Sequence, residues 1–350
     1  MDEGVRAKYN NRYQSIQKRR FLWLITGCIA IILIFIMFKT PLASTIISRM
    51  RGIWIEMNRS MVTYDSQLPE IKNMNLSIEN VNADLENQYE YITKVRKDLY
   101  QGNLILVNSQ YACLLLEKNK LSEVEKYKNK AYKIMDSDMQ LNHETLMAFN
   151  DMMKHFAKAT GKKDMIITSA YRSLKEQADA LQEKVDLFGE EDALKWAMVP
   201  GYSEHHSGYA MDLSIYTDDG EYVNYRGQDE YSWIDLNCYQ FGFIRRYANE
   251  KKDITKVVDE QWHYRYVGVP HAYIMTDKNY CLEEYIDYLR NFTFDKQHLK
   301  VDCEAGVYEI YFVSSEGKET NVPVPQNHEY TISGNNVDGF IVTVTLEDVL

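Results

Sequence analysis

Cysteine is scarce in this chain of 350 residues, and the 40 basic residues are fewer than the 51 acidic ones. Only five cysteines occur, with no C-x-x-C pair among them, so none is assigned a catalytic role. Cys28 lies in an apolar run near the N-terminus, and the other four could be free thiols or form two disulfides in any of three pairings. The formal net charge is −11, and no basic stripe with interleaved aromatic residues occurs, which argues against nucleic-acid binding.

The composition is that of a globular protein. Hydrophobic residues make up 45% of the chain and charged residues 26%, so a wholly disordered chain is excluded. The length allows one domain of ordinary size together with extensions. The composition does not indicate the oligomeric state.

Residues 21–38 (FLWLITGCIAIILIFIMF) form an apolar run of 18 residues without a charge. At about 1.5 Å per residue, this run is just long enough to cross a hydrocarbon core of about 30 Å. More lysine and arginine precede the run than follow it closely, which predicts a cytoplasmic tail at residues 1–20. We therefore expect a single-pass protein of the cell membrane, with everything after about residue 40 outside the cytoplasm.

A cleaved signal peptide is the alternative interpretation of the same run. Small residues at 41–44 (PLAS) offer a cleavage point. However, the charged segment before the run is long, and the run exceeds the usual 7–15 residues of a signal sequence. The pattern therefore favours a membrane anchor.

Three further regions follow along the chain. Residues 39–98 are polar, and Ile78, Val81 and Leu85 recur at helical spacing, which predicts a helical juxtamembrane spacer. Residues 99–293 are expected to form the main domain. Residues 294–350 alternate apolar and polar side chains, which predicts a small β-rich appendage with strands at 307–313, 322–325, 330–333 and 340–346.

Periodic patterns also predict the elements of the main domain. In residues 141–158, apolar residues recur at three- and four-residue spacing, as on an amphipathic helix. Residues 262–267 alternate aromatic and other side chains, as in a strand. The expected helices are 141–158, 174–188, 231–243 (ended by Gly242) and 281–291, and the expected strands are a short run after Gly102, then 165–172, 210–216 and 262–267.

Two short segments carry the residues of a catalytic metal site. Residues 203–212 (SEHHSGYAMD) and 260–263 (EQWH) together supply histidines, an aspartate and a glutamate. A hydrolytic zinc site uses three protein ligands and leaves a position open, with a nearby carboxylate as general base. The two segments have this stoichiometry.

The two segments differ in how readily they bring their side chains together. A turn at Ser207 and Gly208 would bring His205 and Asp212 to one point. Glu260 and His263 are three residues apart, so in a straight strand their side chains would face opposite ways. The chain must therefore bend near Glu260 if both are to face one water molecule.

These segments resemble a known family. Residues 169–173 (SAYRS), 200–212 and 260–268 (EQWHYRYVG) are similar, in order, to motifs of the VanY-type zinc D-alanyl-D-alanine carboxypeptidases, a group that includes the VanX dipeptidases. The resemblance covers roughly residues 99–293. It implies an α+β fold: a compact zinc peptidase domain with a central antiparallel sheet flanked by helices.

The resemblance also implies a role for each site residue. His205, Asp212 and His263 would bind Zn²⁺, Glu260 would be the general base and Arg172 would stabilise the oxyanion. Ser203 and Gln177 would lie near the substrate. His206 is a rival to His205 as ligand, although the family spacing to Asp212 selects His205.

The activity implied by the resemblance is hydrolysis of the D-Ala-D-Ala terminus of peptidoglycan stem peptides, with a contribution to glycopeptide resistance. Two alternatives stay open. One is an L,D-carboxypeptidase that acts on tetrapeptide stems. The other is a catalytically inactive wall-binding module, which the presence of Glu260 disfavours.

Overall fold

The computed structural model describes residues 69, 71, 73–80, 88–114, 120–194, 196–218 and 220–348. The predicted cytoplasmic tail, the membrane span at 21–38 and the start of the predicted spacer lie outside these residues. Across the ranges that are described, no helix combines the length and the apolar character needed to cross a bilayer.

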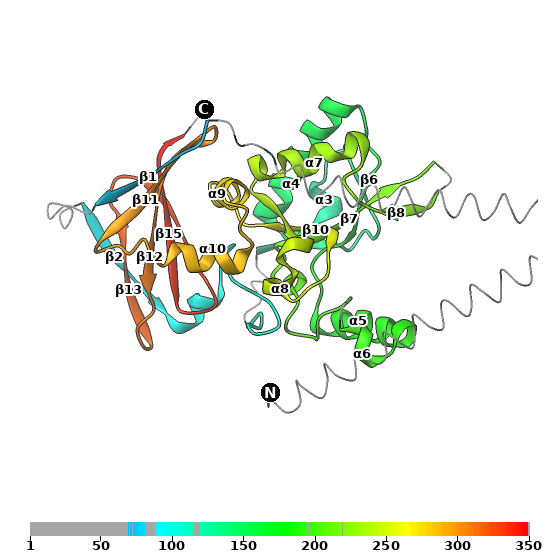
Figure 1. The fold of residues 1–350 in the computed structure, drawn as a ribbon, viewed down its shortest axis with the longest axis horizontal. Coiled ribbons are helices and arrows are strands. Elements are labelled where there is room, and N and C mark those ends of the chain that lie inside the picture. The colour runs from blue at the N-terminus through cyan, green and yellow to red at the C-terminus, as the bar shows by residue number, and fades with distance from the viewer. Residues whose placement is uncertain are drawn as a thin grey trace, which may run out of the picture. The chain divides into compact units, whose positions relative to one another are not determined.

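A six-stranded, largely antiparallel sheet forms the centre of the main domain (Figure 1). Its strands follow the order β4-β6-β7-β10-β9, and β8 pairs with β7. Only the β4–β6 pair is parallel, so the predicted central antiparallel sheet is confirmed with that exception. The strands are β4 (Lys133–Ile134), β6 (Met165–Ser169), β7 (Ala210–Tyr216), β8 (Tyr222–Asn224), β9 (Phe243–Tyr247) and β10 (Glu260–Tyr266).

Helix α4 (His143–Thr160) supplies much of the core against this sheet. The Asn142 side chain caps its N-terminus by accepting from the Glu144 and Thr145 amides, and Gly161 ends it in the left-handed conformation. Its apolar positions pack in one cluster with β6 and β7 residues. The buried side chains on this face include Leu146, Phe149, Met152, Met153 and Phe156, as their spacing predicts.

Helix α5 (Leu174–Phe188) begins directly after Arg172 and coincides with its predicted bounds. A capping box fixes its start, because Ser173 and Glu176 each accept from the other's backbone amide. Strands β3 (Leu121–Glu123) and β5 (Gln140–Asn142) form a small separate pair. The other helices are α3 (Val124–Tyr127), α6 (Glu190–Ala193), α7 (Ser232–Asn237), α8 (Lys252–Thr255), α9 (His271–Asp277) and α10 (Leu282–Leu289).

The helical segment predicted over residues 231–243 is present, but only its first part is α-helical. Helix α7 is followed by a 3-10 turn, and β9 begins at Phe243. Gly242 does stop the helical segment, with a φ of 80°. A Cβ at Gly242 would lie 2.8 Å from a Tyr266 ring carbon and 2.9 Å from the Gly268 Cα, so only glycine fits there without a shift.

A second, five-stranded sheet has the order β1-β11-β12-β15-β14, beside a separate β13–β2 pair. The strands predicted at 307–313, 322–325, 330–333 and 340–346 fall within four of the observed strands, but the sheet also includes β1, from the region predicted to be a spacer. The strands are β1 (Asn75–Asn80), β2 (Tyr89–Val95), β11 (Gln297–Cys303), β12 (Gly306–Ser314), β13 (Glu319–Pro325), β14 (Glu329–Gly334) and β15 (Gly339–Asp348).

The predicted helical spacer is wrong where the structure describes it. Strand β1 pairs antiparallel with β11, and β2 pairs with β13, so the blue and cyan strands lie among the orange ones (Figure 1). In β1 the apolar residues Leu76 and Ile78 alternate with polar ones, which is strand spacing. Val81 and Leu85, on which the helix prediction depended, lie outside the described residues.

The strand predicted after Gly102 is also wrong. Residues 103–107 form an irregular buried loop whose amides bond to Ser333 near the end of β14 and to Asn335 in the turn that follows. The Leu104 amide donates to Ser333 Oγ (2.9 Å), and the Leu106 amide donates to the Asn335 carbonyl (3.0 Å). These partners replace those of a strand, so the loop stays buried without joining a sheet.

One hydrophobic core crosses the predicted boundary near residue 293. Residues of α9 and α10, such as Ile274 and Ile286, cluster with Leu299 of β11 and Ile310 of β12. The second sheet is therefore packed on the main domain rather than tethered to it. Cys113, Cys238, Cys281 and Cys303, the cysteines within the described ranges, form no disulfide.

Candidate metal centre

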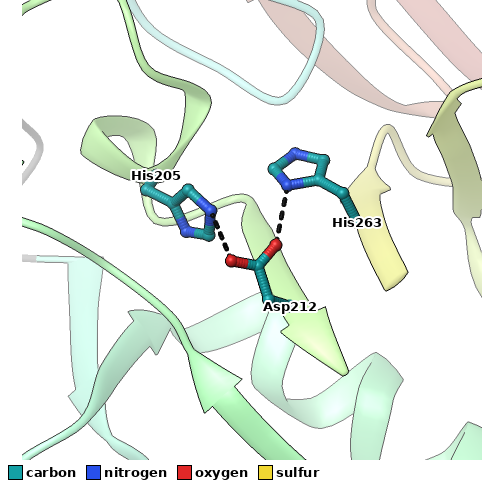
Figure 2. Close-up of side chains that lie close together, drawn as sticks. All are labelled: His205, Asp212 and His263. Carbon is teal, nitrogen blue, oxygen red and sulfur yellow. Dashed lines mark hydrogen bonds and ion pairs between the residues drawn. The ribbon is translucent and has the colours of Figure 1, made fainter. Parts of the chain in front are cut away.

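His205, Asp212 and His263 converge at the centre of the main sheet (Figure 2). One donor atom from each lies within 4.8 Å of the others. His205 Nε2 is 3.2 Å from Asp212 Oδ2, and His263 Nδ1 is 2.9 Å from Asp212 Oδ1. All three residues are largely buried, so the sheet holds the donor atoms in place.

Local backbone geometry explains how the sequence brings them together. His205 lies in a short 3-10 turn that ends at Gly208, whose φ is 75°. A Cβ at Gly208 would lie 2.7 Å from Leu121 Cδ2 and 3.1 Å from the Asn142 nitrogen, which favours glycine at this turn. Asp212 and His263 are directly opposite each other in the antiparallel β7–β10 pair.

Glu260 lies on the same side of β10 as His263 because the strand is irregular between them. The pairing of β10 with β9 shifts register between Glu260 and Tyr264, as in a β-bulge. Glu260 Oε2 is consequently 3.9 Å from His263 Nδ1. The bend that the sequence requires is therefore present.

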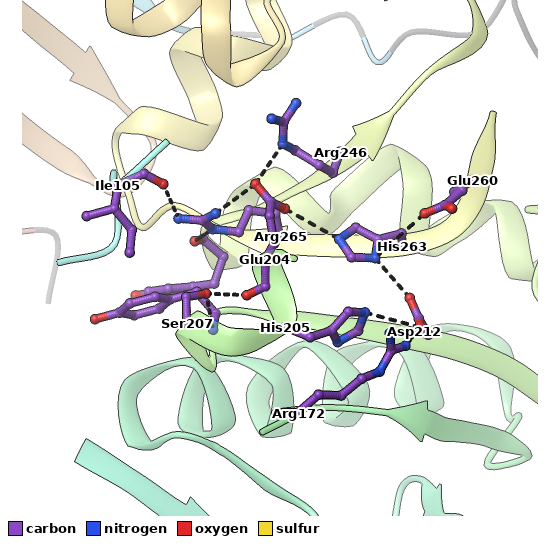
Figure 3. A network of polar contacts seen from close by, with 12 residues as sticks. Ile105, Arg172, Glu204, His205, Ser207, Asp212, Arg246, Glu260, His263 and Arg265 are labelled. Carbon is purple, nitrogen blue, oxygen red and sulfur yellow. Dashed lines mark hydrogen bonds and ion pairs between the residues drawn. The ribbon is translucent and has the colours of Figure 1, made fainter. Parts of the chain in front are cut away.

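Arg172 reaches this cluster from the end of β6 (Figure 3). Its Nη2 donates to Asp212 Oδ2 (2.9 Å), its Nε to Ser169 Oγ (2.8 Å) and its Nη1 to Gln177 Oε1 (3.1 Å). The Gln177 amide in turn donates to the Met198 carbonyl (2.8 Å). Gln177 therefore fixes the direction of the guanidinium.

The ring nitrogens of His206 both have backbone partners. Its Nε2 accepts from the Gly201 amide (2.9 Å), and its Nδ1 is 2.7 Å from the Arg172 carbonyl oxygen. A ring used in this way has no nitrogen left for a metal ion. His205, the residue before it, is the one that faces Asp212.

The two candidate histidine ligands face Asp212 through different ring nitrogens. The Nδ1–H of His205 donates to the Ala170 carbonyl at 2.7 Å, which leaves Nε2, on the side of Asp212, as the nitrogen that could bind a metal ion. His263 instead presents Nδ1 to Asp212, while its Nε2 is 3.4 Å from Glu204 Oε2. Each ring thus turns one nitrogen to the cluster and the other to a partner outside it.

Burial and neighbouring charges shift the titration of these groups. Burial, with the nearby Arg172, lowers the pKa of His205 to about 4. Burial alone would lower the pKa of His263, but hydrogen bonds to Asp212 and Glu204 raise it to about 9. Burial raises the pKa of Glu260 to about 7. A carboxyl group that titrates near neutral pH suits proton transfer in both directions.

Sequence reasoning missed Glu204, Arg246 and Arg265. Glu204 is buried, and its Oε1 accepts from Arg246 Nε and Arg265 Nη1, both at 2.8 Å (Figure 3). The one feature of the sequence that could have pointed to Glu204 is its position directly before the candidate ligand His205. Its partners come from β9 and β10, so no local pattern connects them to it.

A cavity of about 430 Å³ opens beside the candidate site. One wall carries Arg172, Ser203 and Gln177 next to the metal-binding cluster. The cavity continues past residues of α5 and the segment that follows α6, which contribute the lining side chains Ala180, Glu183, Lys184, Leu194, Trp196 and Met198. The predicted site residues therefore all line one cavity.

The donor set fits a zinc ion. Two imidazole nitrogens and one carboxylate oxygen are ligands that zinc accepts, and three protein ligands are the number found in catalytic zinc sites. The carboxylate of Glu260 lies beside the cluster but outside it, as a general base would.

Comparison with known proteins agrees with this arrangement. The sequence profile of the VanY family, described as D-alanyl-D-alanine carboxypeptidase, matches residues 138–269. The chain is 35% identical over 270 residues to a D-alanyl-D-alanine carboxypeptidase of Enterococcus faecium, an alignment covering 76% of this chain and 82% of that protein. It is 31% identical over 158 residues to the bifunctional D-Ala-D-Ala dipeptidase and carboxypeptidase VanXYC of Enterococcus gallinarum, covering 44% of this chain and 81% of that one.

A solved structure is similar as well. The vancomycin resistance D,D-dipeptidase VanXYg, in complex with a D-Ala-D-Ala phosphinate analogue, superposes with a TM-score of 0.65 and 27% identity. The superposition covers 73% of this chain and 99% of that one, so it extends well beyond the matched motifs. The chain belongs to the VanY family of D-alanyl-D-alanine carboxypeptidases.

Proposed function

We propose that this protein is a zinc D,D-carboxypeptidase that removes the terminal D-alanine from stem peptides ending in D-Ala-D-Ala. The observation that carries the proposal is the convergence of His205, Asp212 and His263, with Glu260 beside them and Arg172 bonded to Asp212. Membership of the family supports the same reaction and substrate.

His205, Asp212 and His263 would hold the zinc ion. When bound, zinc supplies Lewis acidity towards the scissile carbonyl and the attacking water. Asp212 contacts both histidines and Arg172, so one carboxylate aligns the ligands with the neighbouring cation.

Glu260 would act as general base and then as general acid. Its carboxylate takes a proton from the attacking water and later gives a proton to the nitrogen of the leaving D-alanine. The raised pKa of Glu260, about 7 because of burial, supports both transfers near neutral pH. The irregularity in β10 keeps its Oε2 within 3.9 Å of His263 Nδ1, beside the candidate ligands.

Arg172 would stabilise the negative charge that develops on the carbonyl oxygen of the scissile bond. Its three hydrogen bonds to Ser169, Gln177 and Asp212 fix the guanidinium before substrate binds. The proposed role of Gln177 is therefore to position Arg172. Of the two residues predicted to lie near the substrate, Ser203 is the one proposed to contact it. The remainder of the stem peptide would extend into the cavity of about 430 Å³.

The proposed location is the outer face of the cell membrane, with residues 21–38 as the anchor. The uncharged run and the basic segment before it support this location. An outward-facing site would reach peptidoglycan precursors. Removal of their terminal D-alanine would take away the target of glycopeptide antibiotics, so a contribution to resistance is part of the proposal.

Purified full-length protein, incubated with Zn²⁺ and synthetic stem peptides, tests the reaction. D-alanine released from a pentapeptide ending in D-Ala-D-Ala, and not from the tetrapeptide, is the expected result. Release from the tetrapeptide alone would instead identify an L,D-carboxypeptidase. A zinc-loaded protein that cleaves neither peptide would contradict the proposal and favour an inactive wall-binding module.

A further inference from the structure

Glu204 uses its two carboxylate oxygens for different purposes (Figure 3). Oε1 accepts from both guanidiniums, Arg246 Nε and Arg265 Nη1, at 2.8 Å each. Oε2 takes part in neither contact and lies 3.4 Å from Nε2 of His263. The Glu204 side chain is 1% exposed, so water does not compete for either oxygen.

The buried charges around Glu204 are balanced. Arg246 donates through Nη1 and Nη2 to the two oxygens of Glu283 at 2.9 and 2.7 Å. Arg265 completes its contacts with the carbonyls of Asn103 (2.9 Å) and Ile105 (3.0 Å). Two carboxylates thus oppose two guanidiniums, an arrangement in which buried ions keep their charge.

The simpler interpretation is that Glu204 only stabilises the fold as part of an ion cluster. That interpretation explains the contacts of Glu204 Oε1 but not the position of Oε2. The cluster would be complete without a contact to His263, since Arg246 and Arg265 are both paired through Oε1. The orientation of Oε2 is what connects the cluster to the candidate metal site. It faces the imidazole nitrogen opposite the one that Asp212 contacts.

We propose that Glu204 is a positioning residue that keeps the proton of His263 on Nε2 and aims Nδ1 at the metal. A carboxylate that accepts from the outer nitrogen of a ligating histidine fixes the tautomer and ring orientation, and loss of such a partner commonly weakens metal binding about 10- to 100-fold. The inference rests on the proposed zinc site and adds a residue to it.

The ion cluster also depends on the irregular loop at residues 103–108. Asn108 Nδ2 donates to Glu283 Oε1 at 3.1 Å, and the loop carbonyls receive Arg265. The same loop is held by the second sheet, because Asn336 Nδ2 donates to the carbonyls of Leu106 (2.7 Å) and Ala112 (2.9 Å). Asn336 is thereby connected to His263 through the loop, Arg265 and Glu204.

Two double variants of the full-length chain test the proposal. A single neutralising exchange at Glu204 would leave two buried guanidiniums with only the carboxylate of Glu283 and risks unfolding. Glu204→Met combined with Arg265→Met removes both acceptor oxygens from the side of His263 Nε2, keeps the charges balanced and retains the Arg246–Glu283 pair. The matched control, Glu283→Met with Arg246→Met, also loses one carboxylate and one guanidinium, but retains Glu204 beside His263 and Arg265.

The measurement is the Zn²⁺ dissociation constant, obtained by competition with a chromophoric chelator, together with the Co²⁺ absorption spectrum. We expect the dissociation constant of the Glu204→Met double variant to rise at least tenfold, with an altered Co²⁺ spectrum. The control should stay within about threefold of the parent, and thermal unfolding should register the loss of one ion pair in both.

Equal Zn²⁺ affinities in the two double variants would overturn the proposal and leave Glu204 a structural residue. That result is distinguishable from failure of the proposed function, in which the parent chain itself would bind no Zn²⁺ through His205, Asp212 and His263.

Discussion

His205 and His206 are neighbours in the chain, but their imidazole rings face different partners. His205 turns Nε2 to Asp212 Oδ2 at 3.2 Å, whereas His206 bonds through both ring nitrogens to backbone groups of Gly201 and Arg172. The 3-10 turn that carries both residues separates their directions. One histidine is thus available to a metal ion, and the other connects the backbone at Gly201 to the backbone at Arg172.

The two histidines should therefore respond differently to substitution. His205→Ala should lower Zn²⁺ affinity by more than the about 10- to 100-fold typical of losing an outer partner. His206→Ala should retain one bound Zn²⁺ and instead lower the free energy of unfolding by about 1–3 kcal/mol, because two backbone groups lose their partners. Metal content after dialysis and thermal unfolding distinguish the two effects. Loss of zinc from His206→Ala, with His205→Ala unaffected, would reverse the assignment.

Substitution of Glu260 should separate metal binding from turnover. Glu260→Ala removes the only proposed proton carrier but none of the three candidate ligands, so zinc content should stay unchanged. The rate constant for D-alanine release should fall by about 10²- to 10⁴-fold, the usual contribution of general acid–base catalysis. Single-turnover kinetics with the D-Ala-D-Ala pentapeptide measures this. A variant that retains activity within tenfold of the parent would exclude Glu260 as the base.

Local patterns predicted the elements that carry the site better than the elements that support it. Helix α5 and strand β7 coincide with their predicted bounds because their periodicity and capping residues lie within a few neighbouring positions. Strands β1 and β2 were missed because their partners, β11 and β13, lie more than 200 residues later in the chain. Pairing over such a separation leaves no trace in a local window.

The same reasoning explains which site residues could be found. The donors His205, Asp212 and His263 belong to two compact segments with a recognisable spacing. Glu204 gains its significance from Arg246, Arg265 and His263, which the fold of β9 and β10 brings to it. No sequence pattern marks the bend at Glu260. It was expected only because Glu260 and His263 must face the same water molecule, and the irregularity in β10 provides it.

Zn²⁺ binding should release protons at neutral pH. Burial alone would lower the pKa of His263, but its hydrogen bonds to Asp212 and Glu204 raise it to about 9. Below pH 9 the metal-free ring therefore carries a proton that the metal must displace, so affinity should fall by about tenfold per pH unit as pH decreases. Calorimetry at pH 7 in buffers of different ionisation enthalpy counts the released protons. Binding without proton release would contradict the raised pKa of His263.

The second sheet should contribute to stability through Asn336. Its side chain is buried between the Leu106 and Ala112 carbonyls, and its φ is 63°, a conformation that glycine also adopts readily. Asn336→Gly therefore removes the amide without backbone strain and leaves two carbonyls without that donor. We expect a loss of about 1–3 kcal/mol in the free energy of unfolding, measured by urea denaturation.

Asn73 provides the matched control for that substitution. It has the same φ of 63° but is exposed, and its Nδ2 lies at 3.5 Å from Glu304. Asn73→Gly should change the free energy of unfolding by no more than about 0.5 kcal/mol, as for ordinary surface substitutions. If both variants lose the same amount, the effect comes from the flexibility of glycine in the unfolded chain, and the contact between the second sheet and the loop at residues 103–112 does not stabilise the fold.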